Sequence, residues 1–164
     1  MKRLLILLVL FVFFTSQIKA AHEGALSYPC SIVLEQVKEI PNSSGTALIT
    51  KVKKPYTDQP ESPVRERTAI GIYADWMPLP STFGEYDQYE GFAQIPGVIS
   101  WRFNMYPVKE DQPSLFGGFP LAGKFDEISA QLSADAIVQL RLSNSRSGNL
   151  GPAILQGRLK GCVK

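Results

Sequence analysis

The sequence has few of the residues that build most catalytic and metal sites. Its 164 residues include one histidine, His22, and two cysteines, Cys30 and Cys162. A Ser-His-Asp or Cys-His system needs an imidazole held by a rigid scaffold, and His22 lies two residues after a predicted cleavage site, where chain ends fray. Zinc sites with three imidazoles are excluded by the count. We therefore expect neither imidazole-based catalysis nor a bound metal or cofactor.

The sequence also lacks a hydrophobic run long enough to cross a membrane. Its longest run, residues 4–14, has eleven residues, whereas a membrane-spanning helix needs about 20. Lys2 and Arg3 precede this run, and a small residue, Ala20, follows it. This layout predicts a signal peptide at 1–20 and an exported chain of one domain at 21–164, destined for a periplasm, a cell surface or the medium.

No run of lysine and arginine follows the predicted cleavage site. Residues 21–164 contain 14 basic and 15 acidic side chains, a net charge of −1. This balance argues against nucleic acid and against anionic lipid as the main partner.

Two cysteines in an exported chain predict a disulfide bond. Cys30 and Cys162 lie near the opposite ends of residues 21–164, so a bond between them would tie the first and last strands together. The alternatives are two free thiols or a bond between two chains.

Apolar residues recur at every second position through most of the chain, which is typical of strands. Prolines and glycines mark loops at 54–66, 77–90 and 107–123. In the run 98–106, Ile99, Trp101, Phe103 and Met105 are expected to face a core. Strands are predicted at 30–37, 46–53, 67–76, 98–106, 125–132, 136–142 and 153–163. The segment 126–136 also fits a short helix, although its surroundings favour a strand.

Seven or eight short strands in one domain predict an all-β fold. The preferred architecture is an antiparallel β-sandwich, because long loops are easily carried at its ends. The alternative is a small β-barrel.

An aromatic and acidic loop at 83–90 is the main candidate site. Tyr86, Asp87, Tyr89 and Glu90, together with Trp76, combine ring faces with hydrogen-bond acceptors, a pattern that suits a glycan or a protein partner. The simpler interpretation is that the two tyrosines cover the edge of the core and the acids are solvated. A third interpretation is that the protein is a secreted carboxylate hydrolase of the glycosidase type, with Asp75, Glu85, Asp87 or Glu90 as acid and base.

A second loop, 115–121, carries bulky apolar residues that include Phe116 and Phe119. They would either fold back over the end of the domain or form an exposed patch, as in a small secreted inhibitor or assembly subunit. The leading hypothesis is a non-catalytic exported binding module that contacts a glycan or a protein through these two loops.

Overall fold

The computed structural model describes residues 24–108 and 118–164. The predicted signal peptide at 1–20, His22 and Phe116 lie outside the described residues. Within the described residues, nine strands and two short 3₁₀ helices (η) follow one another in this order: β1 Cys30–Gln36, β2 Ser44–Pro55, β3 Val64–Met77, η1 Pro80–Phe83, β4 Gln88–Ile95, β5 Ile99–Asn104, β6 Tyr106–Pro107, β7 Phe119–Ile128, β8 Ile137–Ser143, β9 Leu150–Arg158 and η2 Leu159–Cys162.

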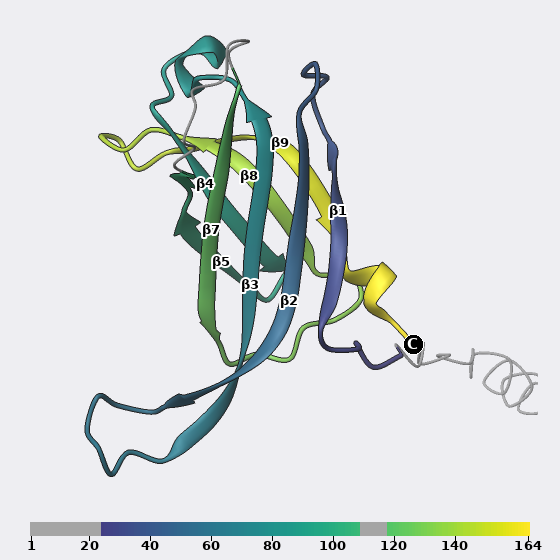
Figure 1. The fold of residues 1–164 in the computed structure, drawn as a ribbon, viewed down its shortest axis with the longest axis vertical. Coiled ribbons are helices and arrows are strands. Elements are labelled where there is room, and N and C mark those ends of the chain that lie inside the picture. The colour runs from purple at the N-terminus through teal and green to yellow at the C-terminus, as the bar shows by residue number, and fades with distance from the viewer. Residues whose placement is uncertain (1–23, 109–117) are drawn as a thin grey trace, which may run out of the picture.

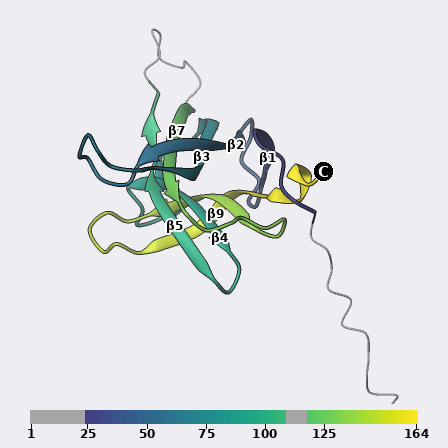
Figure 2. The same cartoon turned by 90° about the horizontal axis from the view of Figure 1, so that it is seen from below.

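All nine strands belong to one antiparallel sheet in the order β5-β4-β8-β9-β1-β2-β3-β7-β6. The strand β1 joins its two halves, because Cys30–Leu34 pair with β2 whereas Glu35 and Gln36 pair with β9. Figure 1 shows β1, β2, β3 and β7 in front of β4, β5, β8 and β9, and Figure 2 shows the same two layers from below.

The two ends of the sheet approach each other. The strands β5 and β6 are separated by Met105 alone, yet β5 pairs with β4 at one end of the sheet and β6 pairs with β7 at the other. The chain therefore crosses from one half to the other and nearly closes the sheet. The predicted all-β antiparallel fold is confirmed, with two facing layers as in a sandwich and nearly joined ends as in a barrel.

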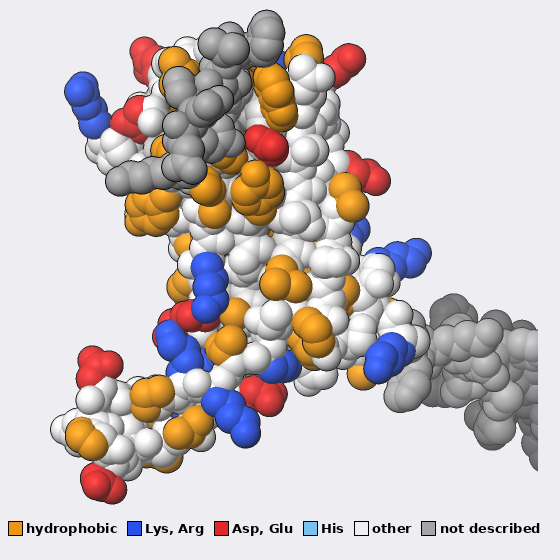
Figure 3. Space-filling view, in the orientation of Figure 1, with side chains coloured by type: hydrophobic (Ala, Val, Ile, Leu, Met, Phe, Trp, Pro, Cys, Tyr) orange, Lys and Arg blue, Asp and Glu red, His pale blue; other side chains and the backbone are white. Residues whose placement is uncertain are grey.

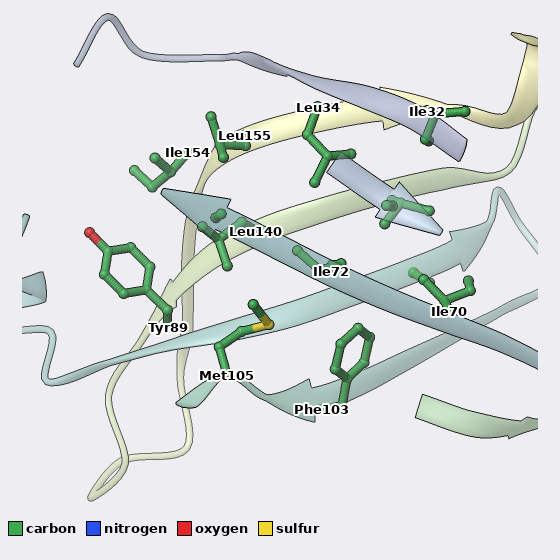
Figure 4. Packing of buried hydrophobic residues seen from close by; sticks show 14 of the residues in the cluster. Ile32, Leu34, Ile70, Ile72, Tyr89, Phe103, Met105, Leu140, Ile154 and Leu155 are labelled. Carbon is green, nitrogen blue, oxygen red and sulfur yellow. The ribbon is translucent and has the colours of Figure 1, made fainter. Parts of the chain in front are cut away.

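The core lies between the two halves, since alternate side chains of each strand point inward. Figure 4 shows Leu34, Ile70 and Ile72 from the front half facing Leu140 and Leu155 from the back half. All five side chains are buried. At the seam between β5 and β7, the rings of Phe103 and Phe125 stack with their centroids 6.2 Å apart.

Several predicted boundaries differ from the structure. The loop expected at 54–66 is shorter, because β2 and β3 stay paired as far as Pro55 and Val64. The loop expected at 77–90 contains the start of β4 at Gln88, and the one expected at 107–123 contains the start of β7 at Phe119. In the segment 126–136, β7 continues to Ile128 and the rest is irregular.

The predicted core face of β5 is buried in part. Phe103, together with Met105 just beyond the strand, is buried, Trp101 is half-buried, and Ile99 is 43% exposed. Ile99 opens the strand beside the turn that connects β4 to β5.

The predicted disulfide between Cys30 and Cys162 is present, and its Cα atoms lie 5.7 Å apart. Cys30 begins β1, and Cys162 ends η2 directly after β9. The backbone N–H of Ser27 also donates to the carbonyl oxygen of Cys162, at 2.8 Å. The first and last strands are thus tied together. No helix among the described residues is long and apolar enough to span a membrane.

Candidate functional site

Tyr89 is placed in the core of the protein. It is 3% exposed in β4, and its hydroxyl donates a hydrogen bond of 3.0 Å to the carbonyl oxygen of Pro78. Burial raises the pKa of Tyr89 well above its ordinary value. Its ring therefore packs in the core and its hydroxyl fixes the segment that leads into η1.

Glu90 is also buried, and its carboxylate is held by three strands. Arg102 of β5 donates to both carboxylate oxygens at 2.7 and 2.9 Å, and the Ser143 hydroxyl of β8 donates at 2.7 Å. The paired Arg102 guanidinium, with help from Ser143, holds the pKa of Glu90 below its usual range. Glu90 and Tyr89 therefore contribute to packing and leave little surface for a ligand.

Trp76 and Phe119 lie together on the neighbouring strands β3 and β7. Trp76 is half-buried with a φ of 55°, at an irregularity in the pairing between Ala74 and Met77. The Oδ1 of Asp75 accepts a 2.8 Å hydrogen bond from the Trp76 backbone N–H, and Phe119 pairs with Met77. Tyr86 and Asp87, in contrast, lie in the loop between η1 and β4.

Asp87 fastens its loop to the turn between β8 and β9. Its two carboxylate oxygens accept hydrogen bonds from the Ser145 hydroxyl at 2.5 Å and the Ser145 backbone N–H at 2.8 Å. These bonds lower the pKa of Asp87. The Asn144 side-chain amide donates to the Glu85 carbonyl oxygen at 2.7 Å, which adds a second connection.

The turn itself is held in one shape by its own side chains. The Asn144 Oδ1 accepts from the backbone N–H groups of Arg146 and Ser147 at 3.1 and 3.0 Å. Gly148 has a φ of 69°, a backbone conformation that glycine adopts without strain. Two loops far apart in the sequence thus form one connected unit.

Between these two loops lies an open hollow of about 370 Å³. We call it the loop hollow. One side is formed by Phe83, Tyr86 and the exposed Glu85, and the other by Ser147 and the exposed Asn149. The described residues that line it are Phe83, Gly84, Glu85, Tyr86, Asn144, Ser147, Asn149 and Leu150. Aromatic side chains beside amide, hydroxyl and carboxylate groups can bind a ligand with many hydroxyl groups.

Sequence reasoning identified one side of the loop hollow and missed the other. Residues 83–90 stood out by their aromatic and acidic composition, whereas 143–148 simply fell between the strands predicted at 136–142 and 153–163. The available signal was the cluster of asparagine, serine and glycine, which marks a turn but not its neighbours in space.

The carboxylate hydrolase needs a carboxyl group with a raised pKa beside a second carboxyl group. Hydrogen bonds instead lower the pKa of both Asp87 and Glu90. Within residues 24–108 and 118–164, no group of three or more His, Cys, Asp and Glu side chains is arranged to hold a metal ion.

Comparison with known proteins matches residues 26–163 to the family described as "SPbeta prophage-derived uncharacterized protein YoqH". The protein of that description from Bacillus subtilis (strain 168) is 45% identical to this chain over 140 residues, which cover 85% of each chain. No solved structure matches.

Proposed function

The chain belongs to the YoqH family, and we propose that it is an exported, non-catalytic domain that binds a glycan in the loop hollow. The observation that carries this proposal is the hollow itself, where Phe83 and Tyr86 lie opposite Ser147 and Asn149. The disulfide fits export, because such bonds persist in oxidising compartments.

The chemistry of the lining favours a saccharide over an apolar ligand. Glu85 and Asn149 are exposed, so their carboxylate and amide groups are open to solvent and to ligand hydroxyls. Because the Asp87–Ser145 and Asn144–Glu85 bonds fix both loops, a ligand would meet a surface that is already ordered.

The test is binding of the purified, oxidised protein to a glycan array that includes bacterial wall polysaccharides. We expect a specific glycan signal, and an affinity about thirtyfold weaker for the double variant Glu85→Ala/Asn149→Ala, since two lost hydrogen bonds at about 1 kcal/mol each cost about 2 kcal/mol. The matched control is Gln59→Ala/Glu61→Ala, at the exposed turn between β2 and β3. The proposal is wrong if no glycan binds, or if both double variants bind it as well as the natural protein.

A further inference from the structure

The hydrophobic core ends where the hairpin of β2 and β3 leaves the sheet. Ile49 and Ile70, which pair across these two strands, are both buried. The next pair on the same face is Lys51 and Thr68, because side chains alternate between the two faces of a strand. Figure 3 shows side chains of both charges gathered at this lower end of the front half, whereas the middle of that half is largely uncharged. The inner face of the sheet thus changes here from apolar to polar side chains.

A pocket of about 330 Å³ lies at this end of the core. We call it the end pocket. Lys51, Thr68 and Ile128, which are register partners on β2, β3 and β7, form one wall. The irregular segment that follows β7 forms a second wall, through residues 129–132.

The segment before β1 forms the third wall, beside the disulfide. Leu26 and Tyr28 line the pocket from this side. Leu26 forms a β-bridge with Val163, and the Ser27 hydroxyl donates to the carbonyl oxygen of the disulfide-bonded Cys162 at 2.9 Å. The third wall is therefore held to the C-terminal end of the fold, and the pocket is a fixed feature of the structure.

Thr68 brings an unpartnered hydroxyl to the end pocket. Its side chain is 1% exposed, and no hydrogen bond joins its hydroxyl to another described residue. Every fully buried side-chain nitrogen or oxygen of the described residues has a hydrogen-bond partner. The Thr68 hydroxyl is therefore not fully enclosed, and it opens on the pocket that Thr68 lines. A buried polar group in this position is satisfied when a ligand supplies its hydrogen bond.

The mouth of the end pocket carries one charge of each sign. The Lys51 ammonium lies 3.4 Å from a carboxylate oxygen of Glu66 and 4.7 Å from the centre of the Tyr28 ring. The side chains of Lys51 and Glu66 are 36% and 58% exposed. An exposed ion pair of this kind contributes little to stability, so each partner can turn to the opposite charge of a ligand at low cost.

We propose that the end pocket binds a small zwitterion, a free α-amino acid with an apolar side chain. Its carboxylate contacts the Lys51 ammonium and the Thr68 hydroxyl, and its ammonium contacts the Glu66 carboxylate. Its side chain packs against Ile128 and Leu132, which are buried and line the pocket.

The pairing of charges at the mouth favours a zwitterion over a ligand with a single charge. Glu66 repels a simple carboxylate that approaches Lys51, and Lys51 repels a simple amine that approaches Glu66, because the two side chains are in contact. The volume of the pocket is near the lower limit for ligand sites, about 300 Å³, which suits a molecule of amino-acid size.

The experiment is titration of the purified, oxidised protein with leucine at millimolar concentration, measured by calorimetry. Two analogues are compared with it: isocaproate, which lacks the amino group, and isoamylamine, which lacks the carboxylate. We expect leucine to bind, and each analogue to bind at least tenfold more weakly because it loses one charge-assisted contact. No binding of leucine, or equal binding of either analogue, would overturn the proposal.

Two substitutions test the assigned contacts. Thr68→Val keeps the shape of the side chain and should weaken leucine binding about fivefold. It should not destabilise the protein in urea, because the lost hydroxyl has no partner in the fold. The matched control Thr50→Val, on the opposite face of β2, should bind leucine normally.

The second substitution, Lys51→Gln, should weaken leucine binding at least tenfold, whereas Lys53→Gln, exposed two residues further along β2, should not. The variant Glu85→Ala/Asn149→Ala should bind leucine as the natural protein does, which separates this site from the loop hollow. Unchanged leucine binding in Thr68→Val or in Lys51→Gln would contradict the contacts proposed for the end pocket.

Discussion

Glu90 connects three strands through one carboxylate. It lies on β4, Arg102 on β5 and Ser143 on β8, and its side chain is 8% exposed. A buried carboxylate is tolerated when hydrogen bonds replace its lost hydration, and here four bonds do so, including one of 3.2 Å from Gln88. The sequence showed Glu90 as one acid among several in an aromatic loop. Its burial depends on Arg102 and Ser143, whose positions follow from the sheet order rather than from local composition.

We predict that Glu90→Gln destabilises the protein by about 2 kcal/mol at neutral pH, because charge-assisted bonds to Arg102 and Ser143 become weaker neutral ones. The folded-state pKa of Glu90 lies below its unfolded value, so the carboxylate stabilises the fold above about pH 4.3. This contribution is lost as the pH falls through the lower folded-state value.

Urea unfolding of the natural protein and of Glu90→Gln should therefore give free energies that converge as the pH is lowered from 7 toward 3. The control Glu61→Gln, exposed at the turn between β2 and β3, should change neither the stability nor its pH dependence. A constant difference between Glu90→Gln and the natural protein at all pH values would contradict the role given to the charge.

At the level of elements, the crossing of the chain from β5 to β6 depends on Gly123 of β7. A Cβ placed there would lie 2.5 Å from the Met105 sulfur and 2.6 Å from the Asn104 carbonyl oxygen. Gly123 thus allows the crossing segment to pass close over β7, which is a common reason for glycine within a strand. The same glycine, with the prolines and glycines before it, made 107–123 resemble one long loop. The period of alternation predicted most strands, but a glycine that serves close packing gives the same signal as a turn.

We predict that Gly123→Ala destabilises the protein by about 2 kcal/mol, since the clash with the Asn104 backbone cannot be relieved by rotating a side chain. The control Gly161→Ala, where a Cβ meets nothing within 4 Å, should stay within about 0.5 kcal/mol of the natural protein. Denaturant unfolding of both variants is the measurement. Equal stabilities of Gly123→Ala and the natural protein would contradict the close contact between Gly123 and the segment that crosses over β7.

Over the whole molecule, the sheet is nearly closed where the chain passes from β5 to β6, and a disulfide between Cys30 and Cys162 ties its first and last strands together. The separation of Cys30 and Cys162 by 132 residues made their pairing predictable from the number of cysteines and the expected compartment. The closure itself was not predictable, because it depends on which strands become neighbours. The pairing of β1 with both β2 and β9 places the first strand in the middle of the sheet, and alternation along one strand contains no information about its neighbours.

We predict that the double variant Cys30→Ser/Cys162→Ser folds to the same sheet but loses about 2–5 kcal/mol of unfolding free energy. The physical reason is that the bond restricts the unfolded chain over a long loop, while the hydrophobic core between the two halves remains intact. Urea unfolding measures the loss, and reduction of the natural protein with dithiothreitol should reproduce it. Because β1 pairs with β9 at two residues alone, amides of β1 should then show the largest rise in hydrogen exchange. Equal stability of the oxidised protein and the double variant, or protection of β1 that does not change, would show that the sheet holds its two halves together without the bond.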